Sequence, residues 1–398
     1  MRARTRLQAL AGAAVLVVAG VWASGVFHQR ERGKPRGAPA PLLAAVASVE
    51  AGRRTTPLIE ATANGEFKVT FLARSSQGQA PRIVSDATGW GEGPDESFSF
   101  SAGTMTRIGE RDWYSLEAHV APRSRIEYLV AYAPGDYRVD PHNPRQAALR
   151  GGGPASEFVT PGYVPPPKLD ELPAELAGRT AGATLHSRAL SGPVDVIVYT
   201  PPGFRGDGNH PVAVFHDRLQ WGRDGEGPRV IDRLIARAEI EPIVTVFAGS
   251  GRPESEVGAG AIRTFLTGEL LAWLSARYAV TGEADRRAIL GVSYGAKDAL
   301  EAASGPSAAY HRVGLLIPGR RLRPADIETL AAQPTNHLQV AILAGLYDAP
   351  NLETARRLRE AFTAAGHAVH YLEVPEGHNA ATWRNHAGEI LAPLFPPR

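Results

Sequence analysis

Hydrophobic and polar residues alternate in the first part of the chain in the way that half-buried strands require. Phe67, Val69 and Phe71 are separated by polar residues. Further strands, with Gly- and Pro-rich turns between them, are predicted over 113–118 and 126–132. No segment of helical period and useful length precedes Pro161, so this part predicts a β-sandwich of about a hundred residues.

The second part of the chain has a different pattern, in which short apolar runs alternate with helix-forming stretches. The predicted strands cover 194–199, 212–215, 243–247, 288–290, 313–316, 338–344 and 368–374. Most of these runs are continuously apolar, which is typical of a parallel sheet that is covered on both faces. We therefore expect an α/β fold, joined to the β-sandwich by a stiff Pro-rich linker that begins at 164–167.

The N-terminus carries a different signal. Arg2, Arg4 and Arg6 precede a mostly apolar run over 7–27, which is about long enough to cross a bilayer as a helix. The run is either an uncleaved anchor or a cleaved signal peptide. Both alternatives place the body of the protein outside the cytoplasmic membrane, as an anchored or a periplasmic or secreted protein. A basic stretch rich in Ala and Pro follows and predicts a flexible tether.

Five segments result from these patterns. We expect a signal anchor or signal peptide over 1–27, a tether over 28–60, a β-sandwich over 61–163, a linker over 164–185 and an α/β domain over 186–398. The connections within the last segment are short, so it holds no insertion large enough for a cap domain.

One motif in the α/β part carries chemistry. The apolar strand around Ile289 runs into Gly291-Val-Ser293-Tyr-Gly295, and a helix-forming stretch follows. This is the pattern of a nucleophile elbow, in which a serine occupies a turn so tight that its neighbours two residues away must be glycines. The alternative is an ordinary serine at a glycine-rich corner.

Two further residues follow the elbow in the order that α/β-hydrolases use. Asp348 comes just after the strand over 338–344, and His378 just after the strand over 368–374. His378 would remove the proton of Ser293, and Asp348 would hold the imidazole in the required tautomer. Asp348 as a helix N-cap and His378 as a loop histidine are the structural alternatives.

Several motifs together give the chain a family resemblance. The segments that carry it occur in the order found in the esterase D group: 212–221, 227–238, the Arg/Glu segment over 252–258, the elbow, 345–348, and Gly377-His378 with Trp383. Within this group of α/β-hydrolases, the chain is most similar to the enterochelin esterase branch. The resemblance implies that the β-sandwich is the immunoglobulin-like domain that precedes the esterase domain there.

The resemblance also implies further site residues. The backbone N–H groups of Tyr294 and Arg218 would form the oxyanion hole, with Arg218 standing where the family usually has glycine. Its side chain either binds an anionic substrate at the cleft mouth or points to solvent. If the position requires a positive φ, the arginine is strained and its N–H is misaimed. Arg252 and Glu256 match an Arg/Glu segment of the family and either line the cleft or form a structural ion pair. The other residues considered for the substrate cleft are His216, Asp217, Trp221 and Trp383.

Composition narrows the function. The net charge is +2 and there is no long basic run, so nucleic acid is not an expected partner. The chain has no cysteine, which excludes disulfides and thiol catalysis. His216 and Asp217 lack a third ligand at a suitable spacing, so we expect neither a metal nor another cofactor. In the β-sandwich, Trp90 and Trp113 either stack on a ligand or pack in the core.

The function predicted from these observations is a serine esterase that transfers the acyl group of an ester to Ser293 and then to water. The first prediction for the substrate is a siderophore-type or aryl ester, and the second is an acyl ester linked to a polysaccharide. The alternative from another class is a non-catalytic binding protein that keeps the fold. This alternative is supported by Arg218, which stands where the family usually has glycine.

Overall fold

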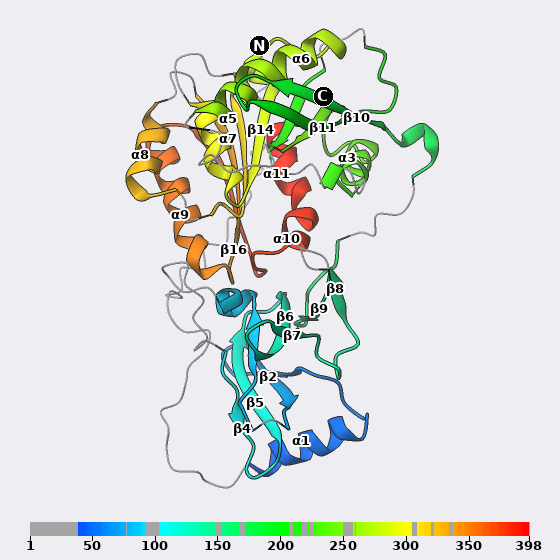
Figure 1. Cartoon of the computed structure of the whole chain (residues 1–398), viewed down its shortest axis with the longest axis vertical. Helices are drawn as coiled ribbons and strands as arrows, with labels where there is room; N and C mark the ends of the chain where they lie inside the picture. Colours follow the sequence, from blue (N-terminus) through cyan, green and yellow to red (C-terminus); the bar gives the residue numbers. More distant parts are fainter. Residues whose placement is uncertain are drawn as a thin grey trace, which may run out of the picture.

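The computed structural model describes residues 39–397 with gaps at 77, 92–102, 149–152, 167–171, 207–209, 217–220, 223–225, 250–257, 259, 305–308, 320–321 and 334–336. It has two lobes, one above the other (Figure 1). We call residues 39–166 the β lobe and residues 172–397 the α/β lobe.

The β lobe consists of two antiparallel sheets and one helix. The first sheet has the order β1 (Leu58–Ala61), β2 (Phe67–Arg74), β5 (Trp113–Val120), β4 (Thr106–Arg107). The second has the order β3 (Arg82–Ser85), β6 (Arg125–Ala133), β9 (Pro154–Val159), β8 (Gln146–Ala148), with β7 (Asp136–Arg138) paired to β6. Phe71 of the first sheet packs edge-on against Tyr128 and Phe158 of the second, with ring centroids 5.0 and 5.7 Å apart. These contacts form the core of a sandwich, as the alternating pattern predicts, and its immunoglobulin-like class stays a prediction.

The expected tether is wrong for its second half. Residues Ala40–Glu50 form helix α1, at the lower end of the β lobe in Figure 1. Its buried residues Val46 and Val49 pack against Leu72, Ile108 and Trp113 of the lobe. The Ala- and Pro-rich composition concealed a helix because the helix is stabilised by this packing rather than by an amphipathic pattern of its own.

The α/β lobe is built around one sheet of eight strands. The strands are β10 (Arg179–Ser187), β11 (Gly192–Thr200), β12 (Val212–His216), β13 (Val244–Ala248), β14 (Arg287–Val292), β15 (Arg312–Leu316), β16 (Gln339–Gly345) and β17 (Ala368–Val374). Their order is β10-β11-β13-β12-β14-β15-β16-β17. The first two pairs are antiparallel and all the others are parallel. The predicted α/β fold and its predicted strands are confirmed.

Helices cover both faces of this sheet (Figure 1). One core contains side chains of α5 (Ala261–Thr264), η3 (Phe265–Glu269), α6 (Leu270–Arg277), α7 (Gly295–Ala303), α8 (Pro324–Ala332) and α9 (Ala349–Ala364). The other contains side chains of α3 (Glu226–Ala236), α10 (Ala380–Asn385) and α11 (Ala387–Leu394). Short 3₁₀ turns occur at η1 (Asp86–Gly91), η2 (Ala174–Leu176) and η4 (Ala284–Arg286). The apolar strands are therefore buried on both sides, which explains their continuous hydrophobicity.

The linker is shorter than expected because β10 begins at Arg179, within the range assigned to it. This strand lies at the sheet edge and its first half is exposed, so its residues give no strong hydrophobic signal. Among the helices that the structure describes, none has both the length and the apolar character needed to span a bilayer. The apolar run over 7–27 lies outside the described residues.

Candidate active site

Ser293 occupies the tight turn between the end of β14 and the start of α7. Its φ of 56° lies in the left-handed region, which a residue with a side chain adopts only at an energetic cost. Ser293 N–H donates to the Leu316 carbonyl, and Gly319 N–H donates to the Ser293 carbonyl, both at 3.1 Å. A Cβ on Gly291 would lie 2.1 Å from the carbonyl oxygen of Gly295. The glycine pattern therefore corresponds to a strand–turn–helix elbow that leaves no room for a side chain at position 291.

The structure brings the three predicted triad residues together. Nε2 of His378 lies 2.9 Å from Oγ of Ser293, and Nδ1 of His378 lies 2.8 Å from Oδ2 of Asp348. Ser293 and Asp348 are buried, whereas about a fifth of the His378 side chain, 22%, is exposed. The two hydrogen bonds form a continuous chain from a buried carboxylate through an imidazole to a hydroxyl group. Such a chain can activate the hydroxyl as a nucleophile.

Asn351 is a member of this group that the sequence did not reveal. Its Nδ2 donates to Oδ1 of Asp348 at 2.7 Å and lies 3.4 Å from Nδ1 of His378. Asn351 follows Asp348 by one turn of α9, so its spacing was the available signal. The Asp348 side chain makes no capping hydrogen bond to α9. Its oxygens are instead turned to His378 and Asn351, which disfavours the N-cap alternative.

Tyr294 is placed where an oxyanion donor is expected. It follows Ser293 directly and precedes α7, and its side chain is 42% exposed. The backbone N–H groups at a helix N-terminus carry partial positive charge that favours a developing oxyanion. The second expected donor, Arg218, lies outside the described residues, as do Asp217, Arg252 and Glu256.

The remaining residues considered for the cleft are buried in the α/β lobe. His216 is the last residue of β12 and is fully buried, and its Nε2 lies 3.0 Å from Oδ2 of Asp298 on α7. Trp221 packs edge-on against Phe215 at 5.1 Å. Trp383 lies in the same core at 4% exposure. All three side chains are buried to about the same degree as Ser293 and Asp348, and their place at the cleft stays a prediction.

Trp90 and Trp113 of the β lobe pack within their own lobe. Trp113 is buried against α1, and its Nε1 donates to Glu50 at 2.8 Å. Trp90 packs on the outer side of the second sheet, and its Nε1 donates to Asp86 at 3.0 Å. Of the two alternatives for these rings, the structure favours packing.

The loop that carries His378 is held by a charged pair. Nε2 of His386 lies 3.0 Å from Oε1 of Glu376, and Nδ1 lies 3.3 Å from Glu389. Burial by itself lowers the pKa of His386, but the hydrogen bonds that its ring donates to these two carboxylates outweigh burial and raise that pKa to about 9. The protonated imidazole therefore fixes Glu376, which is itself only 2% exposed, two residues before His378.

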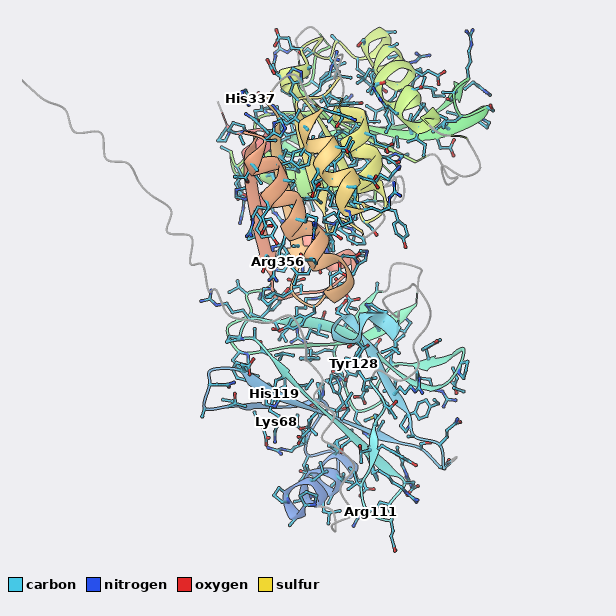
Figure 2. All side chains as sticks on the ribbon, turned by 90° about the vertical axis from the view of Figure 1, so that its left-hand side faces the viewer. Lys68, Arg111, His119, Tyr128, His337 and Arg356 are labelled. Carbon is cyan, nitrogen blue, oxygen red and sulfur yellow. The ribbon has the colours of Figure 1, made fainter. Side chains whose placement is uncertain are left out.

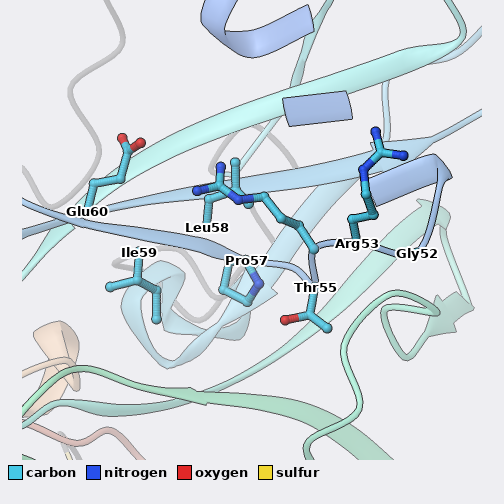
Figure 3. Close-up of a pocket in the computed structure, with 8 residues that line it drawn as sticks. Gly52, Arg53, Thr55, Pro57, Leu58, Ile59 and Glu60 are labelled. Atoms are coloured by element: carbon cyan, nitrogen blue, oxygen red, sulfur yellow. The ribbon is translucent and has the colours of Figure 1, made fainter. Parts of the chain in front are cut away.

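Two hollows among the described residues lie apart from Ser293, Asp348 and His378. One of about 410 Å³ lies over the continuous segment from Gly52 to Glu60 of the β lobe (Figure 3). Another of about 880 Å³ lies between the lobes and is lined by residues of both, including Arg123, Tyr163 and Glu389. None of Ser293, Asp348 and His378 lines either hollow. Neither hollow therefore holds the bond of a substrate that Ser293 would attack.

Two solved structures are similar to this chain in fold. The ferric enterobactin esterase of Salmonella typhimurium is similar at a TM-score of 0.69 and 18% identity, over 86% of this chain and 97% of its own. The enterochelin esterase of Shigella flexneri is similar at a TM-score of 0.64 and 18% identity, over 86% of this chain and 96% of its own. At this identity the likeness is one of fold, and it extends over both lobes.

No curated protein matches the chain. A family model described as "Putative esterase" matches residues 187–392, which include all three residues of the Ser293–His378–Asp348 chain. This match spans more than half of the sequence, and the fold agrees with it. The chain belongs to this esterase family and has the fold of an α/β-hydrolase.

Proposed function

We propose that this protein is a serine esterase in which Ser293 is the nucleophile, His378 the general base and Asp348 the residue that orients the base. The observation that carries the proposal is the hydrogen-bonded chain, with 2.9 Å between His378 and Ser293 and 2.8 Å between His378 and Asp348. Hydrolysis of esters is the chemistry of the family to which the chain belongs.

In the first half of the reaction, Oγ of Ser293 attacks the carbonyl carbon of the ester while Nε2 of His378 takes the hydroxyl proton. Asp348 accepts the Nδ1–H of His378 and stabilises the imidazolium ion that forms. Tyr294 N–H and Arg218 N–H bind the oxyanion of the tetrahedral intermediate. The bond between the carbonyl carbon and the alcohol oxygen then breaks, and the alcohol leaves with the proton from His378.

In the second half, water repeats this sequence on the acyl-enzyme. His378 takes a proton from the water, whose oxygen attacks the carbonyl carbon of the acyl group on Ser293. The bond to Oγ breaks, the proton returns to Ser293, and the carboxylic acid leaves. Atoms balance as ester plus water giving acid plus alcohol, with no cofactor required.

We propose a siderophore-type or aryl ester as the substrate. The two solved enzymes described above are named for enterobactin or enterochelin, and their similarity spans both lobes of this chain. The test is a panel of purified esters, in which enterobactin and simple aryl esters are compared with acylated polysaccharides. Faster hydrolysis of the polysaccharide esters would reject this substrate class.

The matched variants for this test are Ser293→Ala, His378→Ala and the double substitution. Each single substitution should reduce kcat/KM by about 10⁴ to 10⁶, and the double should be little worse, because triad members act as a unit. Hydrolysis by Ser293→Ala at the wild-type rate would refute the assignment. Losses that multiply would show that the two residues do not share a step.

The N-terminal run over 7–27 leads us to propose further that the enzyme acts outside the cytoplasmic membrane, either anchored or released. Cell fractionation with an antibody against the full chain tests this. The active protein should be found with membranes or in the extracytoplasmic fraction. Active cytosolic protein with an intact N-terminus would contradict the proposal.

A further inference from the structure

The loop that carries Asp348 enters the core of the β lobe. Tyr347, the residue before Asp348, is 6% exposed and belongs to the same hydrophobic cluster as Phe71 and Tyr128 of the sandwich. The Tyr347 hydroxyl group accepts the N–H of Ala121 at 2.8 Å. One side of the acid loop is therefore fixed by a lobe that contributes none of the three triad residues.

The loop that carries His378 is fixed by the same lobe through Asn379. Nδ2 of Asn379 donates to Oδ2 of Asp86 at 2.9 Å, and Oδ1 of Asn379 accepts from Nη1 of Arg125 at 3.2 Å. The backbone N–H of Arg125 also donates to the Pro375 carbonyl at 3.1 Å. A Cβ on Gly377 would lie 2.2 Å from Cβ of Asp86. The β lobe therefore contacts the loop on both sides of His378 in the sequence.

These anchors are rigid within their own lobe. Asp86 accepts from Trp90 Nε1 at 3.0 Å and from the backbone N–H of Glu127 at 2.9 Å. Arg125 pairs with Glu127 and with Glu157, each at 2.7 Å. Asp86 and Arg125 are buried, at 1% and 4% exposure. Hydrogen bonds of buried charged groups are directional and resist rearrangement, so the network can hold a loop in one geometry.

We propose that Asp86 and Asn379 are positioning residues, through which the β lobe aims His378 at Ser293. This inference rests on the proposed serine-esterase function and adds to it that the active site is completed across the lobe boundary. The aim of the imidazole matters because a misplacement of about 1 Å can cost roughly 100-fold in rate. The β lobe would then affect every ester, small or bulky, rather than only the fit of large substrates.

The test is a double-mutant cycle on the full-length protein with a small aryl ester. One arm is Asn379→Ser, because serine keeps the N-cap of α10 but is too short to reach Asp86. The other arm is Asp86→Ala. The control is Asp140→Ala, since Asp140 is a buried carboxylate of the β lobe that accepts from Thr56 and Tyr128 and contacts neither loop.

We expect Asn379→Ser and Asp86→Ala each to lower kcat by about 10- to 100-fold, with KM changed less than about threefold. The kcat of the double variant should be no lower than that of the less active single variant. Asp140→Ala should lower thermal stability but keep kcat within about threefold. Three results would overturn the inference. They are a kcat within threefold of wild type for both single variants, losses of kcat that multiply in the double variant, or an equal loss of kcat in Asp140→Ala. Ser293→Ala, run in parallel, separates the two failures: if its activity persists, the proposed function itself is wrong.

A second readout uses the ionisation of Asp86 and stays informative if Asp86→Ala does not fold. Burial, with the negative charge of Glu127, raises the pKa of Asp86 to about 7, although hydrogen bonds and Arg125 oppose this. Trp90 and Asn379 also donate hydrogen bonds to Asp86, and Glu157 forms an ion pair with Arg125. Asp86→Asn imitates the protonated carboxyl group at every pH.

The ratio of wild-type kcat to Asp86→Asn kcat should therefore exceed 1 above about pH 7 and approach 1 below it. A ratio that stays constant from pH 5 to 9 would overturn the role of Asp86.

Discussion

The Tyr347 hydroxyl group, next to Asp348 in the sequence, lies 2.8 Å from Oγ of Ser124 in the other lobe. It also accepts the Ala121 N–H, so one hydroxyl satisfies two polar groups of the β lobe. The substitution Tyr347→Phe leaves these groups without this partner. We expect it to lower the free energy of unfolding by about 1–3 kcal/mol, measured by urea denaturation, and to lower kcat.

The matched control is Tyr310→Phe. Tyr310 is buried as well, and its hydroxyl group donates to the Leu266 carbonyl at 2.7 Å within the α/β lobe. This substitution should cost a similar amount of stability but leave kcat unchanged, because it touches neither triad loop. An equal fall of kcat in both variants would mean that lost stability, rather than lost positioning, reduces the rate.

The close approach of β14 and α7 gives a second prediction. Gly291→Ala places a Cβ 2.1 Å from the Gly295 carbonyl oxygen, so strand and helix must separate and the turn at Ser293 must change. We expect at least about a 100-fold loss of kcat/KM, because the nucleophile moves away from His378. Gly268→Ala is the control, since a Cβ there meets nothing within 4 Å. Wild-type activity in Gly291→Ala would show that the elbow tolerates a side chain.

The backbone of Ser293 gives a third prediction, which concerns stability. Its φ of 56° strains any residue with a Cβ but not glycine. Ser293→Gly should therefore be more stable than Ser293→Ala by about 1 kcal/mol in thermal or urea unfolding, while neither hydrolyses esters. Equal stability of the two variants would indicate that the turn is relaxed in solution.

Sequence patterns predicted the strands of the sheet and the meeting of Ser293, Asp348 and His378. Apolar runs specify strands in a covered sheet, and residues just after parallel strands gather at one edge. The same patterns missed α1 and β10. Helix α1 is stabilised by packing against the β lobe, and β10 by pairing with β11 at the sheet edge. They did not predict the packing of Trp221 and Trp383, whose rings are buried in one core of the α/β lobe, because a motif does not reveal whether a neighbouring aromatic ring points inward.

The contacts between the lobes could not be predicted. Asp86 and Asn379 are 293 positions apart, and nothing in the local sequence of either residue specifies the other. Figure 2 shows the two lobes facing each other, with Arg356 labelled in the α/β lobe and Tyr128 labelled in the β lobe. Pairings of this kind depend on how two finished lobes dock, which hydrophobic periodicity does not encode.

A fourth prediction concerns alkaline pH. Because the pKa of His386 is raised from 6.5 to about 9 in the folded protein, its ion pair with Glu376 stabilises the fold fully below about pH 6.5. That contribution is lost as the pH rises through about 9. The stability difference between wild type and His386→Gln, measured by thermal unfolding, should shrink between pH 6.5 and 10. A difference that is constant over this range would contradict the ion pair.

Covalent labelling tests the central claim most directly. A fluorophosphonate reacts with a serine only where a base activates it and an oxyanion hole accepts the charge. The wild-type protein should be labelled at one site, which peptide mapping assigns to Ser293, and Ser293→Ala and His378→Ala should not be labelled. Folded wild-type protein that remains unlabelled, or label found on another serine, would contradict the proposed triad and favour a binding protein that only keeps the fold.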